Sequence, residues 1–583
     1  MTLIPSRHAW ACLQLTLIWT ANIQAGELTT RMQLTLDRVT HGGPPSYTED
    51  FVLADAVPQH VRRFTEFSGD VSGRYLGALA AVSQYNDRNF PELDRIAAKI
   101  VTLQKEDGHF GDPLSTQDVT TSDMATLWGN GRLLIGLMEY YQLHPTPEVL
   151  ACARRLGDCL VKLGPRFNDS AVMEKFSGDQ IAVGYICWTQ IIEGLVELGR
   201  VTREPNYLNL AGQIADNTHR YPKQHSHGFV SALRGILDLY RVTHDAKWLK
   251  KVESEWEGIL ASGNLFPQGA LPEVFKPLQP DPRDEGCAEA DWLRFNLSLW
   301  TETRNLRYLE NAELTLFNEF YLNQFHTGDF GHHVLSNEGY AAGGARAWWC
   351  CTFHGLRAFP EVLGAAFHSD PAGLSYDLPV DGRISNPSMA LQADSTLAQD
   401  ATATLTVTRA SDKDQTLRLR QPAWASALDL VLNHQPLAAT TSHPGRLEIH
   451  RRWKSGDVLA VHYRLRTRVQ EHPQDAGRFA LLRGPWMLGV DGQNSPTFFD
   501  EDLKRTRLVL PVRAANGDVA LAPAPIPKDG VLPPLVVPTA HLSVPYLPGG
   551  YPCQPQSVTL RPISENTTVA DGTPWVFWFE AAK

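Results

Sequence analysis

Basic residues are fewer than acidic ones in this sequence, cysteines are scarce, and long apolar runs and phosphate-binding loops are missing. Lys and Arg number 53 against 64 Asp and Glu, a formal net charge of −11 over 583 residues. Proteins that bind nucleic acid or an anionic membrane surface need a basic patch, so the charge argues against both partners. No apolar run reaches the roughly 18 residues of a membrane span, and no glycine-rich phosphate loop indicates a nucleotide cofactor. The eight cysteines are too few for a disulfide scaffold.

What remains describes a globular chain. Hydrophobic residues make up 43% and charged residues 20%, so the chain can bury a core and is not disordered. At roughly 150 residues per domain, the length predicts about three or four domains, or fewer large ones. Aromatic residues are plentiful (15 Trp, 16 Tyr and 23 Phe). Composition alone fits sugar stacking and ordinary core packing equally well.

The first 25 residues have the pattern of a signal peptide. The pair Arg7-His8 precedes the apolar stretch Ala9–Ala21, and a cleavage site follows Ala25. This pattern predicts a secreted or periplasmic protein; the alternative is a buried N-terminal segment in a cytoplasmic one. Residues 26–60 are expected to form a β or extended segment, with a short strand at Met32–Leu36.

A degenerate helical repeat fills residues 61–370. Polar turns that begin with Thr and restart with an aromatic residue and Leu recur at 202–208, 243–249 and 303–309. Between them, apolar residues recur with helical spacing, as in the stripe Leu233, Ile236, Leu237 and Tyr240. An array of αα-hairpins is therefore predicted, either as a solenoid or as a closed α/α toroid.

Alternation with period two replaces the helical pattern after about residue 370. It is found in the segments Thr402–Thr408, Leu417–Arg420, Leu447–His450 and Leu459–Leu465. Such runs, separated by turn residues, predict an antiparallel β-sandwich over residues 371–490. The proline-rich residues 491–583 are expected to form a β and loop appendage.

Two short motifs carry the residues of a possible metal site. One is Glu285-Gly286-Cys287 and the other is Trp348-Trp349-Cys350-Cys351. Three thiols and a carboxylate suit a tetrahedral Zn²⁺ ion. The alternative is three buried structural cysteines and a surface glutamate, because free cysteine is among the most buried residue types.

These residues resemble glycoside hydrolase family 127, the β-L-arabinofuranosidases and their relatives. The resemblance covers roughly residues 60–490 and implies an (α/α)6 barrel followed by β-sandwich domains. It also implies that Glu285, Cys287, Cys350 and Cys351 bind Zn²⁺ and that Cys350 is the glycosyl nucleophile. Further segments are similar to family motifs: Ser72–Leu76, Gln104–Gly108, Leu419–Trp424, Arg452–Asp457 and Leu482–Pro485.

The resemblance also points to an acid/base. A retaining glycosidase needs a nucleophile and a tuned carboxyl group on opposite sides of the anomeric carbon. The family places this carboxyl in a segment similar to Pro272–Phe275, which implies Glu273 as the acid/base. The fallback candidates are Asp281, Asp284 and Glu289.

The expected sugar-binding residues depart from the family pattern. Family histidine positions appear here within Gly131-Arg132-Leu133 and Trp188-Thr189-Gln190, and the paired cysteines are followed by Thr352-Phe353-His354. The pocket is therefore expected to be altered. Its candidate substrate-binding residues are Trp349, His354, His225 and His227.

Three functions follow from these features. The first is a retaining exo-acting glycoside hydrolase on β-L-arabinofuranosides or a related furanose of plant glycans. The second is a non-catalytic carbohydrate-binding or structural zinc protein. The third is another α/α-toroid enzyme, such as a polysaccharide lyase or an unsaturated-uronide hydrolase. The site residues favour the first, since a fold alone does not fix function.

Overall fold

The computed structural model describes the chain from residue 26 onward with gaps. The described residues are 26–57, 62–178, 182–276, 283–335, 339–340, 345–472, 475, 477–492, 506–508, 514–519, 522–523, 535–542, 557–565 and 574–581. The predicted signal peptide lies outside them. Among the described helices, none has the length and apolar content to cross a membrane.

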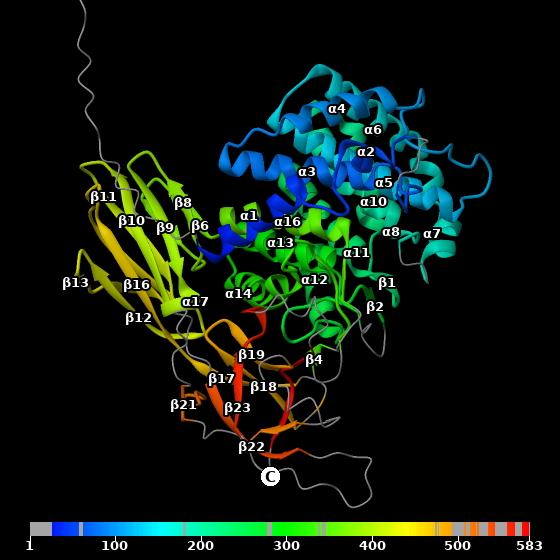
Figure 1. Ribbon diagram of the computed structural model, residues 1–583. Helices are drawn as coiled ribbons and strands as arrows, with labels where there is room; N and C mark the ends of the chain where they lie inside the picture. Colours follow the sequence, from blue (N-terminus) through cyan, green and yellow to red (C-terminus); the bar gives the residue numbers. More distant parts are fainter. Residues whose placement is uncertain are drawn as a thin grey trace, which may run out of the picture.

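Helices fill the first two-thirds of the chain and form an (α/α)6 barrel (Figure 1). The inner helices are α3 (Asp70–Asn86), α5 (Thr121–Leu143), α9 (Ile192–Thr202), α11 (Ser226–Thr243), α13 (Gly286–Thr303) and α16 (Trp349–Ala365). Each packs against the next, and α16 packs back against α3. This last contact closes the ring, so the repeat builds a toroid and not a solenoid.

An outer helix covers each inner one. The outer helices, in the same order, are α4 (Pro91–Leu103), α6 (Pro147–Phe167), α10 (Pro205–Asn217), α12 (Ala246–Ala261), α14 (Leu306–Leu314) and α1 (Glu27–His41). Shorter helical segments connect them: α2 (Glu49–Leu53), α7 (Ser170–Phe176), α8 (Ile186–Thr189), η1 (Thr315–Phe320) and α15 (Tyr321–Asn323).

The sequence repeat marks the turns from inner to outer helices. The residue after each repeated Thr has a left-handed backbone and ends the inner helix: Arg203, His244 and Arg304 have φ of 60°, 56° and 56°. Two residues later the outer helix has begun, either at Pro205 or after the side-chain caps Asp245 and Asn305. The restarting aromatic residues Tyr207, Trp248 and Tyr308 are buried between the two layers.

The expected N-terminal strand is wrong, because Met32–Leu36 lies inside helix α1. Leu28, Met32 and Leu36 are buried, whereas Leu34 is exposed. A spacing of four residues places these three on one face of a helix. That face packs against α16, so residues 27–41 complete the barrel instead of preceding it.

A β-sandwich follows the barrel. Its first sheet has the order β13 (Gln435–Pro436), β12 (Ala425–Leu432), β16 (Val458–Leu465), β10 (Thr402–Ala410), β9 (Met389–Thr396) and β8 (Gly382–Ser385). Its second has the order β14 (Thr440–His443), β15 (Arg446–Arg452), β11 (Asp414–Arg420), β7 (Gly373–Tyr376) and β6 (Phe367–Asp370). The short helix α17 (Leu397–Asp400) joins β9 to β10. All pairs are antiparallel except β7 with β11, and the predicted strands lie in β10, β11, β15 and β16.

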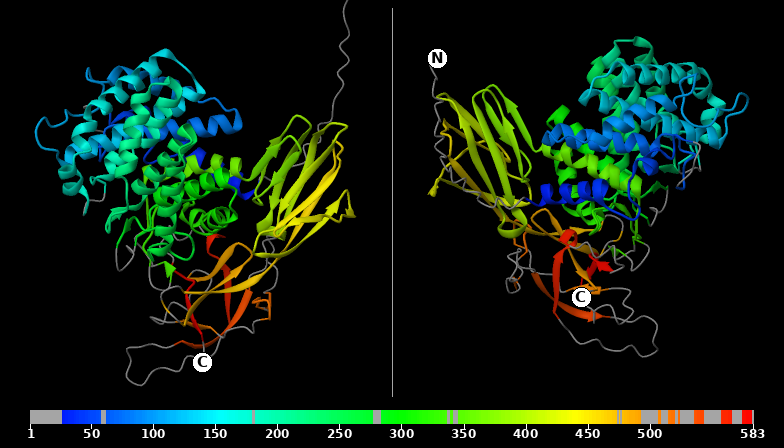
Figure 2. Two further views of the ribbon diagram at one scale, coloured as in Figure 1. Left: turned by 180° about the vertical axis from the view of Figure 1, so that it is seen from behind. Right: turned by 45° about the horizontal axis from the view of Figure 1, so that its top comes forward.

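The sandwich ends at residue 465 and not at 490 as expected. Strands β17 (Thr467–Glu471), β18 (Arg478–Arg483) and β19 (Trp486–Asp491) join a third sheet. Its other members are β20 (Thr506–Leu508), β21 (Ala522–Pro523), β22 (Leu535–Leu542), β23 (Ser557–Pro562), β24 (Trp575–Val576), β25 (Phe579–Ala581) and β4 (Gly339–Tyr340). Strand β4 comes from the barrel, so this sheet ties the C-terminal part to the helices (Figure 2).

Candidate active site

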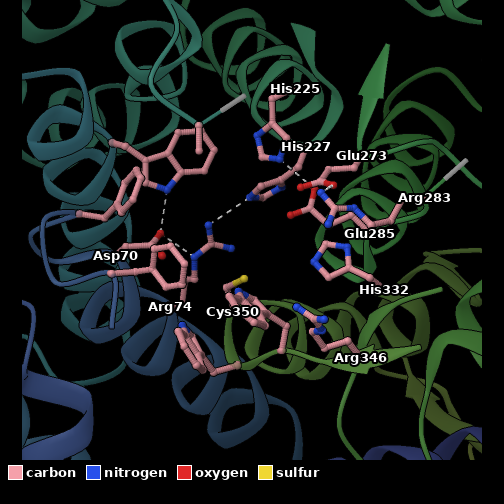
Figure 3. Close-up of a pocket in the computed structure, with 16 residues that line it drawn as sticks. Asp70, Arg74, His225, His227, Glu273, Arg283, Glu285, His332, Arg346 and Cys350 are labelled. Carbon is pink, nitrogen blue, oxygen red and sulfur yellow. Dashed lines mark hydrogen bonds and ion pairs between the residues drawn. The ribbon is translucent and has the colours of Figure 1, made fainter. Parts of the chain in front are cut away.

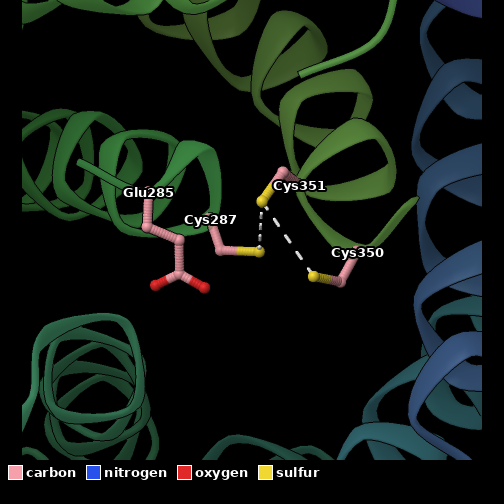
Figure 4. Close-up of side chains that lie close together, drawn as sticks. All are labelled: Glu285, Cys287, Cys350 and Cys351. Carbon is pink, nitrogen blue, oxygen red and sulfur yellow. Dashed lines mark hydrogen bonds between the residues drawn. The ribbon is translucent and has the colours of Figure 1, made fainter. Parts of the chain in front are cut away.

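Two inner helices begin side by side at one end of the barrel, and each carries two of the predicted metal ligands. Glu285 is the N-cap residue of α13 and Cys287 lies in its first turn, while Cys350 and Cys351 lie in the first turn of α16 (Figure 4). Cys287 Sγ lies 3.6 Å from Cys351 Sγ, which lies 4.0 Å from Cys350 Sγ. One ligand atom from each of the four residues lies within 4.8 Å of the others. The two motifs therefore form one cluster.

The cluster fits a tetrahedral zinc ion. A Zn–S bond of about 2.3 Å gives sulfur separations of about 3.8 Å in a tetrahedron, between the two distances observed. A disulfide needs about 2.0 Å, and the three cysteines are free thiols. Three thiols and a carboxylate are also the donor types that zinc prefers. Glu285, Cys287, Cys350 and Cys351 would hold the ion.

Gly286 permits the close approach of the two helices. A Cβ atom at this position would lie 3.0 Å from Cys351 Cβ, 3.1 Å from Phe330 Cβ and 2.6 Å from Asn323 Oδ1. Carbon atoms in ordinary contact are about 3.5–4.0 Å apart. A larger residue between Glu285 and Cys287 would therefore push α13 away from α16.

Helix N-termini and a neighbouring arginine favour the anionic form of Cys350. Burial alone would raise the pKa of this thiol, but hydrogen bonds from Cys287 and Cys351 and the positive charge of Arg74 lower it well below its usual range. The N-terminus of α16 adds a positive dipole end beside the sulfur. Burial also opposes ionisation of Glu285, yet His225, whose Nε2 lies 3.0 Å from its carboxylate, holds the pKa of Glu285 well below its usual range.

Glu273 lies across the cavity from the thiols, directly before strand β2 (Val274–Phe275). Strand β2 pairs with β1 (Gln224–His225), which sets Val274 opposite His225. The Glu273 backbone is fixed by hydrogen bonds with Ser226 and Arg283, and its carboxylate pairs with the Arg283 guanidinium. Burial and the nearby Glu285 raise the pKa of Glu273. A raised pKa suits a general acid.

The fallback acids are less suited to this role. Asp281 lies outside the described residues. Asp284 is fully buried and accepts hydrogen bonds from His333, and Glu289 is fully buried and accepts one from the Leu271 backbone. Neither lines the cavity, whereas Glu273 does.

A cavity of about 310 Å³ opens over this end of the barrel (Figure 3). Five aromatic side chains form part of its wall: Phe64, Phe67, Trp128, Trp348 and Trp349. Ala182, Cys350 and nine titratable side chains form the rest: Asp70, Arg74, His225, His227, Glu273, Arg283, Glu285, His332 and Arg346. Trp348 and Trp349 stack on each other with ring centroids 4.7 Å apart. Aromatic faces next to carboxylates are typical of carbohydrate sites.

The family model "Beta-L-arabinofuranosidase, GH127 catalytic domain" matches residues 17–363, and the model "Beta-L-arabinofuranosidase, GH127 middle domain" matches residues 378–465. The chain belongs to glycoside hydrolase family 127. It is a glycoside hydrolase of the β-L-arabinofuranosidase type, as the resemblance implied. The family's middle domain coincides with the β-sandwich, whose last strand ends at the same residue.

Solved structures of this family share the fold. A GH127 β-L-arabinofuranosidase from Geobacillus stearothermophilus T6 is 16% identical with a TM-score of 0.68, over 95% of this chain and 97% of its own. A second GH127 β-arabinofuranosidase is 17% identical with a TM-score of 0.70, over 95% and 94%. A further structure, described as a glycoside hydrolase, is 18% identical with a TM-score of 0.66, over 89% and 95%. No curated protein sequence matches the chain.

Three of the four predicted sugar-binding residues of this family 127 enzyme line the cavity, and the fourth does not. Trp349, His225 and His227 line the cavity, as expected. His354 does not: it lies one helical turn below Cys350 on α16, is buried, and contacts Arg74. The expectation that it lines the cavity is therefore wrong: His354 is on the same face of α16 as Cys350, but one turn, roughly 5.4 Å, deeper in the barrel.

Five titratable residues of the cavity wall were not identified by the sequence analysis, and one of them is Arg283, the ion-pair partner of Glu273. Asp70 and Arg74 come from α3, and the β3 (Gly331–His332) and β5 (Arg346–Ala347) pair brings His332 opposite Arg346. Only the segment Ser72–Leu76 gave a signal, as a helix entry similar to the family's. The other positions follow from pairings between distant segments, which periodicity does not reveal.

Proposed function

We propose that this enzyme is a retaining, exo-acting glycosidase that uses Cys350 as nucleophile and Glu273 as acid/base on β-L-arabinofuranosides or a related furanose of plant glycans. The observation that carries the proposal is that Cys350, in α16, and Glu273, directly before β2, face one cavity. Zn²⁺ bound by Glu285, Cys287, Cys350 and Cys351 would keep the sulfurs deprotonated.

In the first step Cys350 Sγ attacks the anomeric carbon. A C–S bond forms, the glycosidic C–O bond breaks, and Glu273 gives its proton to the departing oxygen. In the second step Glu273 removes a proton from water, the water oxygen bonds to the anomeric carbon, and the C–S bond breaks. The anomeric configuration is retained because each step inverts it.

His225 and the tryptophans support sugar binding in this proposal. His225 Nε2 is held by Glu285, whereas its Nδ1 has no hydrogen-bond partner among the described residues. A sugar hydroxyl can occupy that position. Trp349, beside Cys350 in the cavity wall, offers an apolar surface to the sugar ring.

Metal content combined with trapping of the nucleophile tests the proposal. Purified protein is analysed by inductively coupled plasma mass spectrometry, then treated with a furanose-mimicking electrophile and mapped by peptide mass spectrometry. One zinc per chain and a single label on Cys350, lost in Cys350→Ser, are expected. Full turnover by Cys350→Ser would refute the thiolate mechanism, and absence of zinc would refute the ligand set.

We also propose that the enzyme is exported. Helix α1 begins at Glu27, so cleavage after Ala25 leaves the barrel complete. N-terminal sequencing of protein recovered from the medium or periplasm of a secreting expression host should give Gly26 as the first residue. An intact Met1 on fully active cellular protein would contradict this.

A further inference from the structure

Arg74 reaches from α3 into the thiol cluster. Its side chain is buried, and its Nη1 lies 3.5 Å from Cys287 Sγ. Its Nε donates to Asp70 Oδ1 at 2.7 Å, one turn earlier on the same helix. In Figure 3 the guanidinium lies between Cys350 and His227.

Two histidines hold the other side of the guanidinium. His227 Nδ1 lies 2.8 Å from Asp291 Oδ2, so it carries the proton and leaves Nε2 as an acceptor, 3.2 Å from Arg74 Nη2. His354 Nδ1 lies 3.0 Å from Arg74 Nη1, and its Nε2 faces Asp291 at 3.7 Å. The carboxylate of Asp291 therefore fixes which ring nitrogens accept.

Both imidazoles are neutral, as acceptors must be. Burial and the charge of Arg132 lower the pKa of His227 to about 4, and burial and the charge of Arg74 lower that of His354 well below its usual range. His227, Asp291 and His354 are close enough to hold a metal ion themselves. Two buried guanidinium groups within 3.2 Å of these rings make another cation there unfavourable.

We propose that Arg74 is a positioning residue of the thiolate site, whose N–H donates to the Cys287 thiolate and fixes that sulfur as a ligand. The inference rests on the metal-bound function proposed above. Hydrogen bonds to a ligating sulfur withdraw electron density from it and orient it. The buried carboxylate Asp291 acts through the two histidines, and Asp70 acts directly, to aim the guanidinium.

Arg132 provides a matched control for this role. It is an arginine of the neighbouring inner helix α5, equally buried, and its Nη2 contacts the same His227 Nε2 at 3.1 Å. Its Nη1 donates to Ser231, and among the described residues it donates no hydrogen bond to a sulfur atom. Loss of Arg132 disturbs the same network without removing the N–H···S hydrogen bond.

Cobalt substitution tests the proposal, because the energy of the thiolate-to-cobalt band would not change if Arg74 had only a structural role. Wild type, Arg74→Met, Arg74→Lys and Arg132→Met are loaded with Co²⁺, and the thiolate-to-cobalt charge-transfer band is recorded. Zinc affinity is measured by competition with a chromophoric chelator. We expect Arg74→Met to shift the band to lower energy and to weaken zinc binding about 10–100-fold, the usual effect of losing a group that supports a ligand. Arg74→Lys should recover part of the shift, and Arg132→Met should leave band and affinity unchanged.

The outcomes separate this inference from the proposed function. If wild type shows the thiolate band but Arg74→Met keeps the same band and affinity, the role of Arg74 is refuted while the metal site stands. If wild type binds neither ion, both fail. If Arg74→Met does not fold, Arg74→Lys and His354→Gln are tested instead. Both variants keep a positive charge at position 74 but alter the N–H···S hydrogen bond. Unchanged spectra in both would overturn the proposal.

Discussion

Replacing Gly286 by alanine tests whether the helix contact determines the metal site. The new Cβ would lie 2.6–3.1 Å from Asn323 Oδ1, Cys351 Cβ and Phe330 Cβ. Restoring contacts of about 3.5–4.0 Å requires α13 and α16 to separate by about 0.5–1 Å. Overpacking of this kind costs about 1–3 kcal/mol. The same displacement moves Cys287 away from Cys351, so the metal should be bound less tightly.

Gly364→Ala is the matched control for this substitution. Gly364 lies near the end of α16, and nothing lies within 4 Å of a Cβ built there. Alanine in a helix interior is favoured over glycine by about 0.5–1 kcal/mol, so this variant should be slightly more stable.

Thermal unfolding with and without a chelator, together with zinc competition, measures both effects. We expect Gly286→Ala to unfold at a lower temperature and to bind zinc at least about tenfold more weakly, the equivalent of about 1.4 kcal/mol. Wild-type zinc affinity and stability in Gly286→Ala would show that the helices can adjust freely and would refute the reasoning.

Three further predictions concern the acid, the metal and the domain contact. Glu273→Gln should slow hydrolysis of a substrate with a poor leaving group by about 10²–10⁴-fold and of an activated aryl glycoside far less; equal losses in steady-state kinetics would indicate a binding or folding defect. Cys287→Ser should lose metal by mass spectrometry, and activity with it, since one of four ligands is removed; unchanged stoichiometry would show that the ligand set is wrong. Glu313→Gln should destabilise the protein by about 3–5 kcal/mol, because it removes the carboxylate that pairs with the buried Arg420 at 2.6 Å, between barrel and sandwich. An unchanged melting temperature would contradict this.

The sequence predicted elements that repeat and ligands that lie in short motifs. The Thr turns at 202, 243 and 303 are visible because each must end one helix and start the next. The vicinal cysteines Cys350 and Cys351 and the Glu285–Cys287 pair are visible because each lies within a single helical turn. Their convergence followed from the family resemblance and not from spacing, since about sixty residues separate the two motifs.

Positions that depend on which segments pair were not predictable from periodicity. Strands β17 to β19 follow the sandwich directly in the sequence, yet they join another sheet, because the residues of a strand do not reveal its partner strand. His332 and Arg346 face the cavity because β3 pairs with β5. His354 lies outside the cavity although it is on the same face of α16 as Cys350, since the helix spacing does not show how deep the cavity extends along that face.

The toroid itself explains why anionic groups gather at this end of the barrel. Inner helices α3, α13 and α16 start there, and their first turns carry or follow Asp70, Glu285 and the cysteines. Each N-terminus favours a negative group by about 0.3–1 kcal/mol when exposed, and by more when partly buried. Arg74 adds a positive charge from the adjacent helix α3. The fold therefore favours the Cys350 thiolate before any metal binds, because hydrogen bonds from Cys287 and Cys351 and the charge of Arg74 lower its pKa. Burial raises the pKa of Cys287 and Cys351, so these two thiols would lose their protons only to a bound metal ion.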